Sequence, residues 1–412
     1  MKNVRRTILV LAAILLGANG VMAAEKVITV KVSNPAGERK AVPVVVEVDD
    51  EIRSALVTLN GTEVPCQLDD LDDDGEFEEL AFLTDMGNKE TQTFKVTLST
   101  TGEPRKYEAQ TYGYLGIRDR AERNPKHMEI TSVTFPKETN PYNYIYPHGA
   151  VMENDMVGFR VYCDHRQSID YYGHRQLKMD SSETGFYTTQ AQRDKGYGED
   201  VLYTGTTYGC GTLQGWDGKT AVMFENVRNR TQTVVCSGPV RTILDITNKA
   251  WKPFADKKST DIRTRYILYR GHRDVEVQVD FSRDVADLPL STGIVDIVEG
   301  STEFSDHNGL RGDWGRACAG NNPSVYDTIT VGLGIFVPKQ YFKGESHFTN
   351  GKKHLPDQAY VQIVGTKDDD LHYWFACTCD IETFGFANKE AWFDWLKAWR
   401  KSLEKPVKIE IK

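Results

Sequence analysis

The sequence lacks the familiar signatures of nucleotide-binding and hydrolytic enzymes. Its 412 residues contain no phosphate-binding loop, no GxGxxG fingerprint, no HExxH zinc motif and no GxSxG nucleophile elbow. A glycine-rich run at 205–215 follows no strand-to-helix pattern, and we predict that it forms β turns. These absences exclude the best-known motif-based families, so any function must be inferred from the polar clusters of the chain.

Cysteine is scarce and irregularly placed. The seven cysteines have no zinc-site spacing, and their odd number leaves at least one thiol free. Cys377 and Cys379 lie two apart in a predicted strand, so they face the same way and should not bond to each other. The scatter does not resemble a disulfide framework, and we expect buried single thiols.

Long apolar runs are also absent after the N-terminus. Residues 1–24 have the pattern of an export signal, with a positive start, an apolar run and small residues before a cleavage point after Ala23 or Ala24. The apolar run, 8–18, is too short for a helix that spans a membrane. We therefore expect a periplasmic or secreted protein without membrane contact after cleavage; the alternative is an uncleaved anchor.

Positive charge is in deficit. Removal of Lys2, Arg5 and Arg6 with the signal leaves 47 basic residues against 59 acidic ones, a net charge near −12. This balance argues against nucleic acid and anionic membranes as partners. One basic island is the exception, and a local positive pocket in an acidic protein suggests an anionic ligand. Between Met156 and Lys178 it holds Arg160, His165, Arg166, His174, Arg175 and Lys178 against Asp164 and Asp170.

Most of the chain alternates apolar and polar residues, as β strands do. Residues 25–105 contain five short strand candidates separated by turns, which is typical of a small β-sandwich. The polar connection 103–106 is the expected domain boundary. Strand candidates then continue to Cys379, with a clear hairpin around 271–274, and predict a large antiparallel domain over 106–412. The fold class is therefore mainly β.

One substantial helix is expected, near Lys389 to Glu404. Asn388 can cap it and Pro406 stops it. A stripe of three tryptophans, which could resemble a platform for sugars, is predicted instead to dock the helix on a sheet. These residues are Trp392, Trp395 and Trp399.

An acidic loop in the N-terminal unit resembles the start of a calcium loop. Asp70, Asp72 and Asp74 are followed by Gly75, but the twelfth position is Ala81 instead of the closing glutamate. We interpret the loop as a plain acidic turn and expect no cofactor. Calcium held by the three aspartates is the alternative.

The segment 140–178 combines aromatic, acidic and basic side chains more densely than any other. Its part 157–164 alternates, which predicts a strand with Arg160, Tyr162 and Asp164 on one face. We hypothesise that this face lines a cleft; the alternative is a packed strand whose polar face forms an ion-pair network. The candidate catalytic residues are His148, Glu153, Arg160 and Tyr162, and the candidate substrate-binding residues are Arg166, Asp170 and His174.

Two further polar clusters lie downstream. One is 193–200, which includes Glu199 and Asp200. The other, 305–323, has four glycines and no strand pattern, so we expect an irregular binding loop. There Trp314 could stack on a sugar ring while Arg311 or Arg316 binds an acid group. The alternative is a surface loop whose tryptophan covers a sheet edge.

The stretches PHGAVMENDMVGFRVYCDHRQSIDYYGH and GYGEDVLYTGTTYGCGTL resemble the shared parts of an uncharacterised secreted family. The family is a domain of unknown function. Its members occur in polysaccharide-utilisation loci of gut-type Gram-negative bacteria. The similarity covers most of residues 25–405. The resemblance implies a large domain like the supersandwich of galactose mutarotases and several polysaccharide lyases, beside a small N-terminal β-sandwich and one C-terminal helix. It assigns no catalytic residue.

Two functional hypotheses follow, both with a poly- or oligosaccharide as partner. The first is an enzyme acting on acidic, uronate-containing oligosaccharides. Elimination needs a group that neutralises the carboxylate, a base and an acid, which arginine, histidine and tyrosine can supply. Hydrolysis instead needs two placed carboxylates, for which Glu153, Asp155, Asp164 and Asp170 are candidates. The second hypothesis is a non-catalytic carbohydrate-binding or accessory protein.

Overall fold

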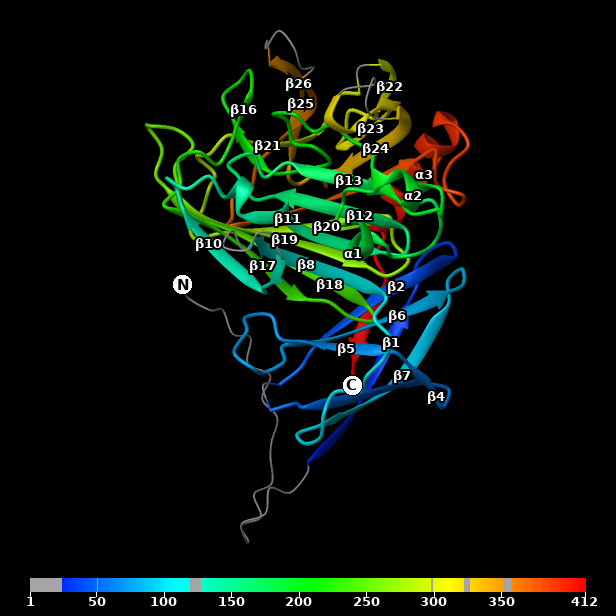
Figure 1. Cartoon of the computed structure of the whole chain (residues 1–412). Coiled ribbons are helices and arrows are strands. Elements are labelled where there is room, and N and C mark those ends of the chain that lie inside the picture. The colour runs from blue at the N-terminus through cyan, green and yellow to red at the C-terminus, as the bar shows by residue number, and fades with distance from the viewer. Residues whose placement is uncertain (1–23, 50, 119–126, 298, 322–326, 351–356) are drawn as a thin grey trace.

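The computed structural model describes residues 24–49, 51–118, 127–297, 299–321, 327–350 and 357–412 (Figure 1). Strands make up 51% of the structure and helices 8%, which confirms the mainly β prediction. Residues 1–23, most of the expected export signal, lie outside the described residues. Among the described residues, no helix is long and apolar enough to cross a membrane.

The N-terminal unit consists of two small sheets packed around a valine-rich core. Val30, Val44 and Phe94 are fully buried between them. The sheet orders are β28-β1-β7-β3-β4 and β2-β6-β5. The strands are β1 (Glu25–Ser33), β2 (Arg39–Glu47), β3 (Ser54–Leu59), β4 (Thr62–Val64), β5 (Cys66–Asp69), β6 (Glu79–Met86), β7 (Thr91–Ser99) and β28 (Lys408–Ile411).

The last strand of the chain belongs to this N-terminal sheet. β28 pairs antiparallel with β1, with Val30 opposite Ile411. The predicted large domain covers 106–412, and residues 408–411 of that range find their hydrogen-bond partners in β1 of the N-terminal unit. A short-range sequence pattern does not report so distant a pairing.

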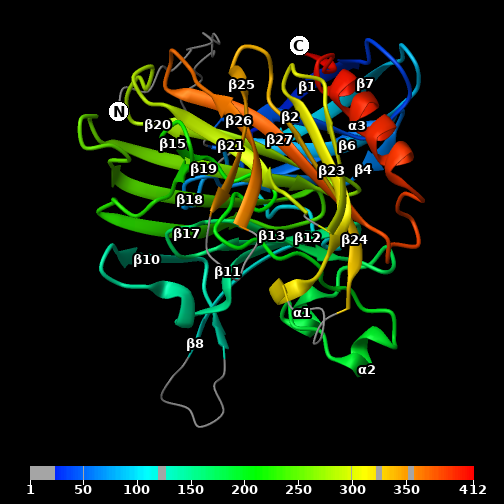
Figure 2. The same ribbon diagram turned by 90° about the horizontal axis from the view of Figure 1, so that it is seen from above.

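The large unit is built on one nine-stranded antiparallel sheet in the order β10-β17-β18-β19-β20-β27-β24-β23-β22 (Figure 2). The alternation in β20 places Val275, Val277 and Val279 in the core and Glu276 on the opposite face. Its strands are β10 (Ser132–Pro136), β17 (Asn229–Cys236), β18 (Arg241–Trp251), β19 (Thr260–Tyr269), β20 (Asp274–Phe281), β22 (Glu299–Ser305), β23 (Leu310–Ala317), β24 (Ile329–Phe336) and β27 (Asp370–Cys379).

Two further sheets cover the inner face of the nine-stranded sheet. The six-stranded sheet has the order β14-β13-β12-β11-β8-β9, and the five-stranded sheet has the order β16-β15-β21-β26-β25. Their strands are β8 (Thr111–Arg118), β9 (His127–Glu129), β11 (Ile145–Asn154), β12 (Val157–Tyr162), β13 (Ile169–Gly173), β14 (Glu199–Asp200), β15 (Gln214–Trp216), β16 (Ala221–Val222), β21 (Leu290–Val295), β25 (Phe342–Asn350) and β26 (Asp357–Val364).

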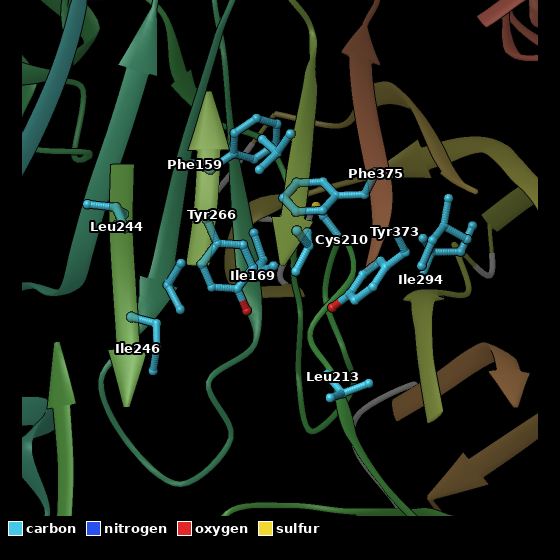
Figure 3. Packing of buried hydrophobic residues seen from close by; sticks show 14 of the residues in the cluster. Phe159, Ile169, Cys210, Leu213, Leu244, Ile246, Tyr266, Ile294, Tyr373 and Phe375 are labelled. Atoms are coloured by element: carbon cyan, nitrogen blue, oxygen red, sulfur yellow. The ribbon is translucent and has the colours of Figure 1, made fainter. Parts of the chain in front are cut away.

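The main core lies between these three sheets. Figure 3 shows Phe159 of the six-stranded sheet and Ile294 of the five-stranded sheet in one cluster with Tyr266, Tyr373 and Phe375 of the nine-stranded sheet, with Ile294 beside Tyr373. The rings of Phe159 and Phe375 meet edge to face with centroids 5.2 Å apart. Because this core takes the inward side chains of every sheet, the polar side chains of the six-stranded sheet are left on its outer face.

The predicted C-terminal helix is present as α3 (Lys389–Leu403), and Asn388 accepts a hydrogen bond from the Ala391 backbone amide at 2.9 Å. Leu396 packs on the outer face of the nine-stranded sheet, over Gly312 and Gly334, where added β-carbons would collide with it. The other described helices are one turn long. They are α1 (Ser181–Thr184), α2 (Gln190–Arg193), and the 3-10 turns η1 (Pro141–Asn143) and η2 (Ala319–Asn321).

The expected binding loop at 305–323 is mostly a strand, so that prediction was wrong. Residues 310–317 form β23, paired on both sides with β22 and β24; Asn322 and Pro323 lie outside the described residues. Gly312 sits where the helix approaches the sheet closely, so glycine replaced the apolar residue that would have revealed the strand.

Six of the seven cysteines are buried, as expected. The N-terminal sandwich packs on the outer face of the nine-stranded sheet. Arg241 of β18 crosses this boundary and lies 2.7 Å from the Asp69 carboxylate and 2.5 Å from that of Glu79.

Candidate functional site

The candidate site lies on the outer face of the six-stranded sheet. In β12, Phe159 and Val161 point into the core, whereas Arg160 and Tyr162 point outward, as their alternation predicts. β13 adds Asp170 and β14 adds Asp200 to the outer face. One sheet face therefore gathers the polar residues of three strands.

A chain segment that carries α1 and α2 covers part of this face. Its Phe186 and Tyr187 rings lie over the Arg160 guanidinium, at 4.5 Å and 5.6 Å from the ring centroids. The Arg160 side chain is only 2% exposed as a result. The segment leaves Tyr187 itself 46% exposed, so the edge of the covered region reaches solvent.

Arg160 does not face an open cleft, which corrects our expectation of a ligand-binding arginine. Its guanidinium pairs with Asp170 and lies 3.2 Å from Asp200. It also donates hydrogen bonds to the hydroxyls of Tyr162, at 2.9 Å, and Tyr187, at 3.1 Å. Burial with these partners makes Arg160 the group that positions the site, because a buried guanidinium needs its charge balanced nearby.

Asp170 and Asp200 share the same Arg160 nitrogen. Burial and the nearby Asp170 charge raise the pKa of Asp200 well above its usual range, although Arg160 opposes the shift. Burial also raises the pKa of Asp170, against the effect of Arg160. Asp170 is 1% exposed, so it does not contact a ligand as we expected, whereas the Asp200 side chain is 18% exposed. Carboxyls with raised pKa values are the type that hold and release protons in active sites.

His148 lies at an irregular position of β11 with a left-handed backbone, φ 73°. Its Nδ1 is 2.6 Å from the Tyr142 carbonyl oxygen. A carbonyl only accepts, so Nδ1 carries the proton and Nε2 carries the free electron pair. Burial, together with the Arg160 charge, lowers the pKa of His148 despite that hydrogen bond. His148 is therefore a neutral imidazole, suited to take a proton.

Aromatic rings surround His148. Tyr142 stacks on it at 3.9 Å, and Tyr187 meets it edge-on at 6.1 Å. Burial raises the pKa of Tyr187 to about 12, with a small opposing effect of Arg160, so its hydroxyl keeps its proton at neutral pH. A neutral imidazole and a protonated phenol thus lie side by side.

Arg166 lies beyond Tyr142, and its side chain is 20% exposed. Its guanidinium is 4.7 Å from the Tyr162 ring centroid and 5.7 Å from that of Tyr142. Its Nε and one terminal nitrogen bind Asp164, at 2.9 Å and 2.8 Å, and the other terminal nitrogen donates to the Gly205 carbonyl at 3.2 Å. Arg166 therefore keeps partial contact with solvent beside the Tyr142 ring, while Asp164 balances its charge.

A cavity of about 260 Å³ adjoins these residues on the side of α1. His127 stacks on Tyr146 at 3.5 Å within its lining, and Tyr146 lies 6.3 Å from Tyr187. The aromatic lining of this cavity therefore continues to His148 through Tyr187. Tyr112, Tyr114, Glu183 and Phe186 complete much of the wall.

Glu153 and His174, two other predicted site residues, are fully buried and do not reach a ligand. His174 Nε2 lies 2.9 Å from Glu153 Oε1. Burial alone would lower the pKa of His174, but Glu153 outweighs it and raises it. Glu153 also accepts from the amides of Asp180, at 2.8 Å, and Ser181, at 2.9 Å. The pair ties the α1 segment to β11.

Glu153, His174 and Asp180 could together offer three ligand atoms to a metal ion. The carboxylate oxygens of Glu153 and Asp180 are, however, already occupied by protein N–H and O–H donors. Asp180 accepts from the Tyr172 hydroxyl at 2.9 Å and from the Gly198 amide at 3.0 Å. The cluster fits an internal ionic network better than a metal site.

Trp314 and Arg311 do not join the site either. Trp314 packs beside α3 on the outer face of the nine-stranded sheet. Arg311 lies on the opposite face of the same strand, over the Tyr360 ring, and pairs with Glu303 and Glu345. Side chains alternate between the two faces of a strand, so Arg311 and Trp314, three positions apart, point to opposite faces. They therefore cannot bind the same ligand together.

The acidic loop of the N-terminal unit is held together by its own backbone. Asp70 accepts hydrogen bonds from the amides of Asp73, at 2.7 Å, and Gly75, at 2.8 Å. Asp70, Asp72, Asp74 and Glu78 bring carboxylate oxygens within 4.8 Å of one another. The plain acidic turn stays our prediction and calcium binding the alternative, and experiment can decide between them.

Residues 32–409 match the family described as a domain of unknown function, DUF4861. The chain belongs to this family. No curated protein matches it. The DUF4861 assignment fixes the relationship of almost the whole described chain and leaves its chemistry to be derived from the residues.

Two solved structures are distantly similar to this DUF4861 chain. A protein in the glycosyl hydrolase family 38 from Enterococcus faecalis shares 11% identity with a TM-score of 0.47, over 94% of this chain and 47% of that one. An alpha-mannosidase from Enterococcus faecalis V583 shares 12% identity with a TM-score of 0.45, over 94% and 46%. The chain thus spans about half the length of each, and similarity at this level does not indicate a reaction.

Three residues of the site were missed as candidates. The sequence patterns assign no catalytic or binding role to Tyr142 or Tyr187, and they include Asp200 only as a member of a polar cluster. Asp200 and Tyr142 lie in the dense segments 193–200 and 140–178, which is the signal that could have found them. Tyr187 lies in an irregular stretch between two short helices, where no periodic pattern marks the direction of a side chain.

Proposed function

We propose that this protein is a periplasmic or secreted enzyme that cleaves acidic, uronate-containing oligosaccharides by elimination. The observation that carries the proposal is the neutral His148, with a free Nε2, beside the protonated hydroxyl of the partly exposed Tyr187. Arg166 lies near the Tyr142 ring that stacks on His148, with its guanidinium 5.7 Å from the ring centroid. A base, an acid and a cation are the three groups that uronate elimination requires.

Each of these side chains has one role in the proposed reaction. Arg166 pairs with the uronate carboxylate and favours loss of the adjacent C5 proton. His148 Nε2 takes that proton, and the C5–H electron pair forms a C4–C5 double bond. The C4–O bond breaks, and Tyr187 donates its proton to the departing oxygen. Water returns the proton to Tyr187, and His148 releases its own to solvent.

The remaining residues support this arrangement. Arg160 holds the Tyr187 hydroxyl at 3.1 Å and the Tyr162 hydroxyl at 2.9 Å. Tyr162 donates to Asp170 at 3.1 Å, so its proton is less available than that of Tyr187. Asp200, with its raised pKa, can exchange a proton with solvent close to Arg160. We include in the proposal a mutarotase-like supersandwich and a place in polysaccharide utilisation.

Hydrolysis fits the geometry less well. Two carboxyl groups must flank the scissile bond with room for the sugar between them. Asp170 and Asp200 instead bind one arginine nitrogen, and Asp170 is buried. A non-catalytic carbohydrate-binding protein is the second candidate, favoured by the extent to which protein partners already saturate Arg160.

The test is incubation of the protein with a panel of polyuronides. Elimination produces a conjugated double bond that absorbs ultraviolet light, together with new reducing ends. Hydrolysis produces reducing ends without that absorbance. A raised melting temperature with neither product would identify a binding protein and refute the proposed elimination.

A further inference from the structure

A second and larger cavity, of about 530 Å³, shares no lining residue with the first and reaches Met156 in the turn between β11 and β12. It opens between the N-terminal sandwich, helix α3 and the hairpin that joins β19 to β20 on the outer face of the nine-stranded sheet. The N-terminal sandwich contributes Arg39, Val42 and Pro43, and the helix contributes Trp395 and Trp399. Cavities at domain interfaces are preferred ligand sites.

Tryptophans form one wall and part of the floor of this cavity. The Trp395 and Trp399 rings are nearly parallel, with centroids 5.6 Å apart and planes 12° from each other. Trp374 of β27 adds a third indole from the sheet. Docking of α3 already uses Trp392, which is fully buried and donates to the Leu333 carbonyl at 3.2 Å. Trp395 also stacks on Trp392, with centroids 5.1 Å apart, so it lies between two parallel indoles. Trp395 and Trp374 stay partly exposed and offer apolar ring edges to a ligand.

Two carboxylates stand on the floor beside these rings. Glu276 lies directly opposite Trp374 in the sheet, and Asp274 is two residues before it on the same face. Their side chains are 21% and 13% exposed. His372 lies 3.0 Å from Glu276, and His272 lies 3.1 Å from Asp274. The floor therefore carries two carboxylates, each held by a histidine, that can accept hydrogen bonds from a ligand.

Both carboxyls are ionised. Burial would raise their pKa values, but His272 outweighs burial at Asp274, and His372 outweighs it at Glu276, so both pKa values are lowered. The ion pairs with these histidines use Asp274 Oδ1 and Glu276 Oε1. The second oxygen of each carboxylate is directed to no histidine and can accept from a hydroxyl group. The buried indole N–H of Trp399 lies near the Asp274 carboxylate, but it completes no hydrogen bond among the described residues.

The lining as a whole carries no strong net charge. Its acidic residues number three, and three lysine and arginine residues balance them. One of these, Arg273, is already paired with the buried Glu382 at 3.1 Å. A strongly charged ligand would gain little here, whereas a neutral molecule with an apolar face and several hydroxyls matches both the rings and the acceptors. The residues counted are Glu38, Asp274 and Glu276 against Arg39, Lys40 and Arg273.

We propose that this cavity is a second carbohydrate site, which binds a neutral pyranose unit against Trp374 and Trp395 with its hydroxyls on Asp274 and Glu276. The proposal rests on a carbohydrate as the protein's ligand, but not on the elimination reaction. Because Arg166 does not line this cavity, this site would hold a polymer by a neutral stretch, away from the uronate-binding arginine.

The experiment measures binding of neutral tetrasaccharides of the cello, xylo, manno and galacto series by calorimetry and tryptophan fluorescence. Ala398→Trp fills the cavity from an exposed helix position, so the fold should tolerate it. We expect at least one series to bind, and Ala398→Trp and Glu276→Gln each to weaken binding at least tenfold. Arg263→Ala, a half-exposed arginine outside the cavity lining, is the matched control and should leave neutral-sugar binding unchanged.

Two outcomes would overturn this proposal. Either no neutral tetrasaccharide binds the full chain, or binding occurs and Ala398→Trp does not weaken it. Trp374→Ala gives a second reading if it folds, as judged by an unchanged melting temperature. Product formation from polyuronides is assayed in parallel with the same variants. Neutral-sugar binding without polyuronide cleavage would refute only the elimination, and cleavage without neutral-sugar binding would refute only the second site.

Discussion

His148 Nδ1 lies 2.6 Å from the carbonyl oxygen of Tyr142, and this contact decides which ring nitrogen is free. The free Nε2 makes His148 the base of the proposed reaction. We expect His148→Asn to lower kcat/KM on a cleaved polyuronide by 10²–10⁴-fold, the usual contribution of general base catalysis. Asparagine tolerates the left-handed backbone at this position, so the melting temperature should hold. Tyr142→Phe keeps the carbonyl and the stacked ring and serves as the control.

The protonation of His148 should set the acid limb of the pH profile of kcat/KM. Because the pKa of His148 lies below its usual 6.5, kcat/KM should stay high as pH falls through 6.5 and decline only at lower pH. The measurement is kcat/KM from about pH 4 to pH 8 in the wild type and in His148→Asn. An unchanged acid limb in the variant would assign that limb to another group.

Arg166 should act mainly in substrate binding. We expect Arg166→Ala to weaken polyuronide binding by the worth of a charge-assisted hydrogen bond, roughly 1.5–3 kcal/mol. Arg166→Lys should recover only part, because an ammonium does not match a carboxylate with two parallel bonds. Arg263→Ala removes a half-exposed arginine from another sheet and is the control. Equal effects of the Arg166 and Arg263 variants would show a general charge effect instead of a site.

Arg160→Ala should reduce stability more than any binding-site variant. It leaves Asp170 and Asp200 without their cation, and removal of one partner from a buried ion pair costs about 3–5 kcal/mol. Urea unfolding at neutral pH measures the loss. The triple variant with Asp170→Asn and Asp200→Asn should recover a large part of it. A small stability change with lost ligand binding would instead restore Arg160 as a ligand-binding residue.

Substitution of Asp200 by asparagine should raise the free energy of unfolding in a pH-dependent way. Its pKa is raised in the folded protein, so the folded state binds more protons than the unfolded state above the ordinary value of 3.8. The Asp200 carboxyl therefore costs stability as pH rises from 3.8 through its folded pKa. Asp200→Asn should raise the free energy of unfolding at pH 7, and the gain should vanish near pH 3. Thr58→Ala, at a partly exposed strand position in the other unit, controls for surface substitution. A variant that is less stable at pH 7 would contradict the predicted sign.

The acidic loop predicts little response to calcium. Backbone amides already occupy both oxygens of Asp70, so the loop is held without an ion. We expect a chelator to leave the melting temperature nearly unchanged, in the wild type and in Asp72→Ala alike. A drop of many degrees that added calcium restores, and that Asp72→Ala abolishes, would establish a calcium site instead.

Local patterns predicted the parts of the fold that depend on near neighbours. The cap at Asn388, the helix after it and the shared face of Arg160 and Tyr162 all follow from spacing along the chain. Glycine weakened the pattern where elements pack closely. Gly312 and Gly334 make room for Leu396, and the strand that contains Gly312 was therefore mistaken for a loop.

The candidate site was only partly predictable, because its partners come from distant positions. Arg160 and Asp200 are 40 residues apart, and an irregular segment carries the chain between them. Composition showed arginines in an acidic protein but not which of them would be neutralised within the fold. Burial decided this: Arg160 became internal, and Arg166, six residues later, kept its access to solvent.

The pairing of β28 with β1 has a consequence for biosynthesis. Thr29 and Lys412 exchange backbone hydrogen bonds of 2.8 Å and 2.9 Å, so the first sheet to emerge from the ribosome gains its edge strand only after residues 408–411 have been made. Until then β1 presents an open edge to the nascent chain and to its surroundings. Residues 408–411 therefore cover the edge of β1 only at the end of synthesis. A stop codon just before β28 would release a chain in which the edge of the N-terminal sheet stays unpaired.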